Sequence, residues 1–247
     1  MREVISVKYP CDLHTHSIAS GHGTSDTIFC MAGAAGRKGI TLLGISDHGP
    51  ATCAAAKPSY FRSLAHAPRR RCGIEVLYGA EVSIVDPEGN VDLPDDVLAC
   101  LDYVIISMHP HILTPGNAAD NTRAFLLAMR HPKVKIIGHP DDPRFPLDYE
   151  TLVRAAAENH IFPEINNCSL DPAGYRGDTR ENIRTLLEYC GRFRTPVILS
   201  SDAHGAGGIG DFAFAEAMLS ETGFPAELVA GSDPEALRRE ITGQKTR

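Results

Sequence analysis

Short, almost continuously apolar segments recur along the chain and alternate with segments of helical spacing. Runs of this kind are typical of strands covered on both faces, as in a parallel sheet between helices; they lie at 41–46, 103–107, 134–138 and 196–200. The last helical segment begins with Asp233 as a cap and Pro234 in its first turn. About seven strand–helix units follow one another. This pattern predicts an α/β fold with a mainly parallel sheet, and it favours a closed or distorted barrel over an open sheet.

Length and composition indicate one globular domain. The 247 residues can form a substantial core, and no linker or repeat divides the predicted domain 1–247. The 24 Lys and Arg against 31 Asp and Glu give a net charge of −7, which argues against a nucleic-acid partner. No apolar stretch approaches the ~20 residues of a membrane span, and residues 1–9 lack signal-peptide features. We therefore expect a complete cytoplasmic protein without a membrane partner, and its scattered cysteines are expected to be free thiols.

Nearly every predicted strand ends in a side chain that can bind a metal ion. His14 and His16 are two positions apart, a spacing that places both side chains on one face of a strand. Asp202 and His204 repeat this spacing further along the chain. The carboxyl ends of parallel strands form the catalytic face of α/β barrels, so we expect a metal site there. The candidate ligands are His14, His16, His22, His48, Glu81, His109, His139, Asp202 and His204.

This set of ligands is too large for one ion. A catalytic zinc takes about three protein ligands and keeps one position open for water, so the set predicts two or three ions with a bridging carboxylate. Imidazole-rich sites suit zinc, manganese or iron. Each histidine alone could be structural, and the prediction depends on seven of the eleven histidines falling at strand exits. His66, His131 and His160 are expected at the surface, and the role of His111 stays open.

The same residues stand in motifs that resemble those of the PHP (polymerase and histidinol phosphatase) superfamily. The motifs are Asp12-Leu-His-Thr-His16, Ser46-Asp-His-Gly49, Gly79-Ala-Glu81, His109, Gly138-His-Pro140 and Ser201-Asp-Ala-His204. They follow in order over nearly the whole chain. The resemblance is strongest with the stand-alone YcdX-type bacterial phosphatases, which share the segments at 163–169 and 232–237. It implies a distorted (β/α)7 TIM-like barrel with the metal site at the C-terminal ends of the strands.

The resemblance also implies a trinuclear centre of divalent ions, with zinc as the first choice and manganese or iron as alternatives. The implied sets are His14, His16, Glu81 and Asp202 for one ion, Glu81, His109 and His139 for the second, and His22, His48 and His204 for the third. A hydroxide bridging two ions is a nucleophile near neutral pH, so we expect hydrolysis of a small phosphomonoester. The catalytic residues would be Glu81, Asp202 and Arg176, the last as a phosphate clamp because a guanidinium pairs well with phosphate oxygens.

Three other functions stay open at this point. A histidinol-phosphate phosphatase shares the metal motifs, and the segment 21–26 resembles its His-Gly loop. A binuclear amidohydrolase also begins with His-x-His, although such enzymes often bridge their ions with a carbamylated lysine, where this chain has Glu81. A non-catalytic metal-binding PHP module is the alternative of a different class. The oligomeric state and the natural substrate are not predicted.

Overall fold

The parallel sheet predicted from the apolar runs is present and forms the centre of the fold. The computed structural model describes residues 8–243, so residues 1–7 and 244–247 of the predicted domain, and with them most of the segment judged to lack a signal peptide, lie outside the described part. Eight of the nine strands of the main sheet follow one hydrogen-bonded path. In spatial order they are β1 (Cys11–Asp12), β3 (Leu42–Ile45), β5 (Ile74–Ser83), β6 (Tyr103–Ser107), β7 (Val134–Ile137), β8 (Phe162–Asn166), β9 (Val197–Ser200) and β11 (Val229–Ala230).

All the pairs along this path are parallel, which confirms the predicted α/β class. The ninth strand, β4 (Arg70–Arg71), pairs with β5 in the antiparallel direction. The sheet curls into a half-barrel, and within residues 8–243 no ladder joins β11 back to β1. On the C-terminal side of this seam, β2 (Thr15–His16) pairs with β10 (Ala203–His204) and brings His16 opposite His204. Among the described strands, the β2–β10 pair is the only ladder between the two sides of the seam, and it lies at the end where the metal site is predicted.

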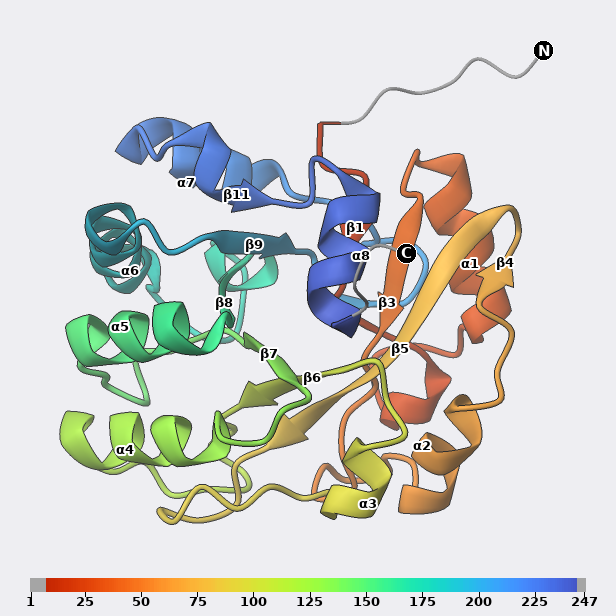
Figure 1. Ribbon diagram of the computed structural model, residues 1–247, viewed down its shortest axis with the longest axis horizontal. Helices are drawn as coiled ribbons and strands as arrows, with labels where there is room; N and C mark the ends of the chain where they lie inside the picture. The colour runs from red at the N-terminus through yellow and green to blue at the C-terminus, as the bar shows by residue number, and fades with distance from the viewer. Residues whose placement is uncertain (1–7, 244–247) are drawn as a thin grey trace.

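Helices cover the outside of the curled sheet (Figure 1). They are α1 (Ile28–Arg37), α2 (Pro58–Leu64), α3 (Asp95–Leu98), α4 (Ala118–Ala128), α5 (Tyr149–Asn159), α6 (Arg180–Phe193) and α7 (Ala213–Thr222), with 3-10 turns η1 (Ile18–Ser20), η2 (Cys168–Leu170) and η3 (Ala226–Leu228). The last helix, α8 (Pro234–Thr242), packs instead against the interior of the barrel. Side-chain caps begin several of the helices: Asp148 accepts from Thr151 N, and Asp233 accepts from Glu235 N and Ala236 N, as predicted for the last helix.

None of the helices within residues 8–243 has the length and apolar character that a membrane span requires.

Alternation along each strand divides the apolar residues between two cores. In β6, Val104 and Ile106 face the layer beneath the helices, while Tyr103 and Ile105 belong to a separate cluster inside the barrel. The ring of Tyr103 crosses this interior, and its hydroxyl donates to the carbonyl of Leu13. Such an approach requires glycine at position 44, where a Cβ would lie 2.1 Å from the Tyr103 oxygen.

Helix α8 fills the N-terminal end of the barrel. Its residues Leu237 and Ile241 are buried against the interior cluster, which also contains the first residues of β6 and β8. Figure 1 shows α8, in blue, lying between β9 and β1, close to the open seam. The apolar end of the barrel is thus covered, and the polar end carries the predicted site.

Candidate metal centre

The nine predicted ligands converge at the carboxyl ends of the strands. They follow or end β1, β2, β3, β6, β7, β9 and β10, except for Glu81, which lies within β5 two residues before its end, and His22, which lies in the loop after η1. Neighbouring strands bring their ligands together: His48 and Glu81 form an isolated parallel bridge, and His204 pairs with His16. Most of these side chains are buried, including His14, His16 and Glu81, whereas His22 is exposed at the rim.

Glu81 lies at the middle of this cluster, and each of its oxygens faces imidazole nitrogens. Oε2 lies 2.7 Å from His48 Nδ1, 3.3 Å from His14 Nε2 and 3.6 Å from His16 Nε2. Oε1 lies 2.8 Å from His139 Nε2 and 3.4 Å from His109 Nε2. A carboxylate in this position can be shared by more than one ion.

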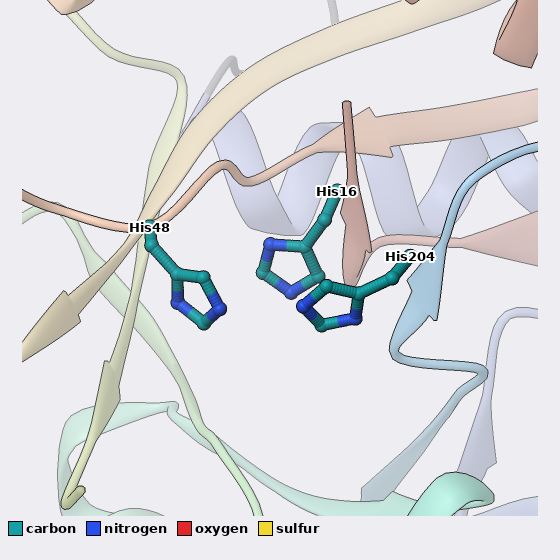
Figure 2. Close-up of side chains that lie close together, drawn as sticks. All are labelled: His16, His48 and His204. Carbon is teal, nitrogen blue, oxygen red and sulfur yellow. The ribbon is translucent and has the colours of Figure 1, made fainter. Parts of the chain in front are cut away.

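Three groups of ligand atoms lie close enough to hold an ion each, with all atoms of a group within 4.8 Å of one another. They are His14, His16 and Glu81; His48, Glu81 and His109; and His16, His48 and His204. Figure 2 shows the last group, whose rings turn toward one another from three separate segments. The grouping overlaps with the predicted sets but differs at two points. It places His16 with His48 and His204, and it places His48 rather than His139 with Glu81 and His109. The individual ligand assignments remain predictions.

The donor atoms fit divalent metal ions. The atoms His14 Nε2, His16 Nε2, His204 Nε2 and Glu81 Oε2 are buried and lack a hydrogen-bond partner among the described residues. A buried polar atom without a partner costs about 1–3 kcal/mol, so several of them at one place require an explanation. Imidazole and carboxylate are the donors that zinc and related ions take. Metal binding would satisfy these atoms together.

The electrostatics favour the ligating forms of the carboxylates. Burial raises the pKa of Glu81 and of Asp202, but positive charge at His48 and His14 holds that of Glu81 well below its ordinary value, and positive charge at His14 does the same for Asp202. Bound cations would supply this positive charge in place of the imidazole protons, which must leave before the histidines can bind a metal. Burial and the neighbouring His48 and His204 hold the pKa of His16 well below its ordinary value, which keeps its imidazole neutral. The ionised carboxylate and the neutral imidazole are the forms that bind metals.

Several residues to which sequence reasoning gave no role contact the predicted ligands. His14 Nδ1 lies 2.7 Å from Glu164 Oε1. His16 Nδ1 lies 2.9 Å from the hydroxyl of Ser20, which donates to Asp47, and His109 Nδ1 lies 2.9 Å from the hydroxyl of Ser83. Each contact leaves the other ring nitrogen for the centre. A signal was present for Glu164, because β8 is an inner strand whose end supplies none of the nine predicted ligands.

A cavity of about 300 Å³ opens over the ligands. Its lining consists of His22, Gly23, His48, His109, His111, Tyr175, Arg176, Asp202 and His204. Arg176 and His111, which sequence reasoning left uncertain, therefore both lie at the mouth. Arg176 is buried, and its Nη2 donates to Asp202 Oδ2 at 3.1 Å while Nη1 donates to the hydroxyl of Ser169 at 3.2 Å.

The four histidines that are not predicted ligands are exposed or half-buried. His66 and His160 are exposed and His131 is half-buried, and none of the three lines the cavity. His160 ends α5 in the left-handed conformation, with φ 53°. His111 is exposed, with its ring centroid 5.5 Å from that of His109.

Comparison with known proteins connects this arrangement to phosphatases. A family model described as PHP domain matches residues 12–164. A probable phosphatase of Clostridium novyi is 38% identical over 231 residues, which are 94% of this chain and 93% of that protein. A probable phosphatase of Syntrophotalea carbinolica is 39% identical over 225 residues, 91% of this chain and 92% of that protein.

A solved structure shares the fold at low sequence identity. It is a histidinol phosphate phosphatase from Lactococcus lactis in complex with zinc, L-histidinol and phosphate. The TM-score is 0.59 and the identity 19%, over 89% of this chain and 95% of that chain. At this identity the likeness concerns the fold alone.

Proposed function

Because the chain belongs to the PHP domain family, we propose that it is a metal-dependent phosphatase that hydrolyses a small phosphomonoester. The observation that carries the proposal is the position of Glu81, whose two carboxylate oxygens face five imidazoles beneath an open cavity. The relatives that cover nearly the whole chain are named probable phosphatases. A phosphorylated substrate is the partner that this chemistry requires.

The proposed centre holds three divalent ions, with zinc first and manganese or iron as alternatives. Its ligand sets are His14, His16, Glu81 and Asp202; Glu81, His109 and His139; and His22, His48 and His204. When bound, the ions would lower the pKa of water to give a hydroxide nucleophile and would neutralise the charge on the phosphate. Buried unpaired ligand atoms support this occupancy, and the zinc in the histidinol phosphate phosphatase structure is a precedent within the same fold.

The protein groups around the cavity would bind and orient the phosphate. Arg176 borders the cavity while Asp202 and Ser169 hold its guanidinium, so its charge is directed without a large loss of side-chain entropy. Its positive charge faces the space where a phosphate would enter. Asp202 and Glu81 remain ionised beneath it and serve as ligands rather than proton donors.

The size of the cavity supports a small substrate. A volume of about 300 Å³ is at the lower end for small-molecule pockets, which range over roughly 300–1,000 Å³. A phosphate and a short leaving group fill such a space, whereas a nucleic-acid strand needs an extended basic groove. The net charge of −7 agrees with this choice.

A substrate panel tests the proposal. Protein stripped with a chelator and reloaded with zinc, manganese or iron is assayed on p-nitrophenyl phosphate, a set of small phosphomonoesters and bis-p-nitrophenyl phosphate. We expect turnover of monoesters only after reloading. Activity on diesters alone would overturn the preference for monoesters. Metal binding without turnover of any ester would favour the non-catalytic alternative.

Histidinol phosphate belongs in the same panel. The loop that resembles the histidinol-phosphate type packs against the centre: a Cβ at Gly23 would lie 2.7 Å from His204 Cβ. His22 of this loop lines the cavity beside His204. A kcat/KM for histidinol phosphate far above those of the other monoesters would select that function.

A further inference from the structure

Strand β8 carries two buried polar side chains at its carboxyl end. Glu164 and Asn166 are two positions apart, which places both on the face that looks into the barrel. Both are fully buried, with an exposed fraction of 0%. A buried carboxylate beside a buried amide is expensive unless each polar atom has a partner. Their partners explain why the pair is there.

Each oxygen of Glu164 contacts a different predicted ligand. Oε1 lies 2.7 Å from His14 Nδ1, and Oε2 accepts from the backbone N–H of His139 at 2.6 Å. Asn166 Nδ2 donates both to Glu164 Oε2 and to Asp202 Oδ2, at 3.1 Å in each case. The pair therefore contacts ligands that arise from β1, β7 and β9.

Two of these ligands have a backbone conformation that needs support. His139 and Asp202 have positive φ angles, 28° and 55°. Such conformations cost about 1–3 kcal/mol in a residue other than glycine and persist only where neighbours enforce them. The hydrogen bond that His139 N–H donates to Glu164 and the one that Asn166 donates to Asp202 act at these two residues.

We propose that Glu164 and Asn166 are positioning residues, which hold the His14 ring with its proton on Nδ1 and fix His139 and Asp202 in their strained conformations. The Nε2 atom of His14 then stays free of a proton and faces Glu81, as a metal ligand must. One carboxylate thereby couples ligands from different proposed sets. The inference rests on the proposed metal-dependent function.

Only an ionised carboxylate can meet these contacts. Every group that faces Glu164 in them is a donor: His14 Nδ1–H, His139 N–H and the amide of Asn166. A glutamine of the same shape has one oxygen and one NH₂ group. With its oxygen toward His14, the NH₂ meets two donors; in the other orientation the NH₂ faces His14 and favours a proton on Nε2, which blocks metal binding. Glu164→Gln is therefore a sharp test.

The experiment compares Glu164→Gln with Asp102→Asn. Asp102 is a carboxylate distant from the cavity that accepts from Tyr78 N and Arg69, so its loss perturbs the fold without touching the ligands. Zinc affinity is measured by competition with a chelator, and the protonated ring nitrogen of His14 is identified by NMR in zinc-loaded protein labelled with ¹⁵N-histidine. Loss of such a partner costs about 10- to 100-fold in metal affinity. We expect a loss of this size in Glu164→Gln, together with loss of the Nδ1–H signal, and neither change in Asp102→Asn.

Asn166→Ala keeps the test decisive if Glu164→Gln does not fold. This variant retains the carboxylate at His14, so we expect the Nδ1–H signal to persist while zinc affinity falls through Asp202. Wild-type zinc affinity and an unchanged His14 signal in Glu164→Gln would overturn the inference. Wild-type affinity in Asn166→Ala would overturn the part that concerns Asp202. The proposed function would survive both results if His14→Ala still abolished metal binding, and it would fail separately if His14→Ala bound zinc normally.

Discussion

Arg176 Nη2 lies 3.1 Å from Asp202 Oδ2, while the other oxygen of the same carboxylate, Oδ1, lies 3.2 Å from His16 Nε2. One oxygen thus accepts from a guanidinium and from Asn166, and the other faces predicted metal ligands. Arg176 therefore acts at two places, on Asp202 and at the wall of the cavity. Its substitution is expected to affect both ligand position and phosphate binding.

Arg176→Met is expected to lower kcat/KM for a phosphomonoester by about 100-fold or more, the usual effect of removing a preorganised donor to a reacting phosphate. Arg176→Lys keeps the charge but cannot contact Asp202 and Ser169 through two nitrogens, so an intermediate loss is expected. Steady-state kinetics with saturating zinc provide the measurement. Arg180→Met is the matched control, because Arg180 is exposed and pairs with Glu221. Equal activity of the two Met variants would exclude a role for Arg176.

Metal content and activity are expected to disappear together in His14→Ala and in Asp202→Ala. Both side chains contribute to the cluster around Glu81 and His16, and their loss leaves buried partners unsatisfied. Elemental analysis and a p-nitrophenyl phosphate assay on the same preparation check this. His66→Ala serves as the control, since His66 is exposed away from the cavity. Full activity in metal-free His14→Ala would contradict the metal-dependent mechanism.

Gly44→Ala is expected to destabilise the fold. The new Cβ would lie 2.1 Å from the Tyr103 hydroxyl and 2.7 Å from backbone atoms of Leu13, so the barrel interior would have to move. Overpacking of this kind costs typically about 1–3 kcal/mol. Urea unfolding of metal-free protein measures the loss. Gly207→Ala is the matched control, because no atom of residues 8–243 lies within 4 Å of a Cβ there. Equal stabilities of the two variants would contradict the predicted clash at Gly44.

The seven cysteines are all free, as predicted. The exposed ones are expected to react with a thiol reagent much faster than the buried ones. Burial raises the pKa of Cys11 and of Cys190 to about 12, so at pH 8 neither carries appreciable thiolate in the native state. Cys30, Cys53 and Cys72 are exposed. We expect rapid labelling of these three by a thiol reagent, with Cys11 and Cys190 reacting only after denaturation. Mass spectrometry of digested protein identifies the labelled sites, and rapid native labelling of Cys190 would contradict its burial.

The sequence predicted the fold class and the location of the candidate site because both depend on local patterns. Apolar runs mark β6 and β7, and predicted ligands such as His48 stand at short range from the ends of most strands. Since the ends of parallel strands meet at one edge, position along the chain was enough to bring these residues together.

The orientation of the ligands could not be predicted in the same way. The contact of Glu164 with His14 spans 150 positions and depends on the curl of the sheet, which periodicity does not report. The closeness of His16 to His48 likewise arises from ring packing at 4.3 Å between centroids, across separate strands. The sequence also did not predict which end of the barrel Leu237 would cover, because an amphipathic last helix can pack against either end.

Helix α8 covers one end of the barrel, and the cavity opens at the opposite end. Leu237 and Ile241 are buried against the interior cluster and cover the apolar end. We therefore expect substrate and products to exchange through the cavity that Arg176 and Tyr175 line. On the proposed function, a phosphate product would leave by the same opening through which the next ester enters, so inorganic phosphate is expected to compete with substrate for the cavity.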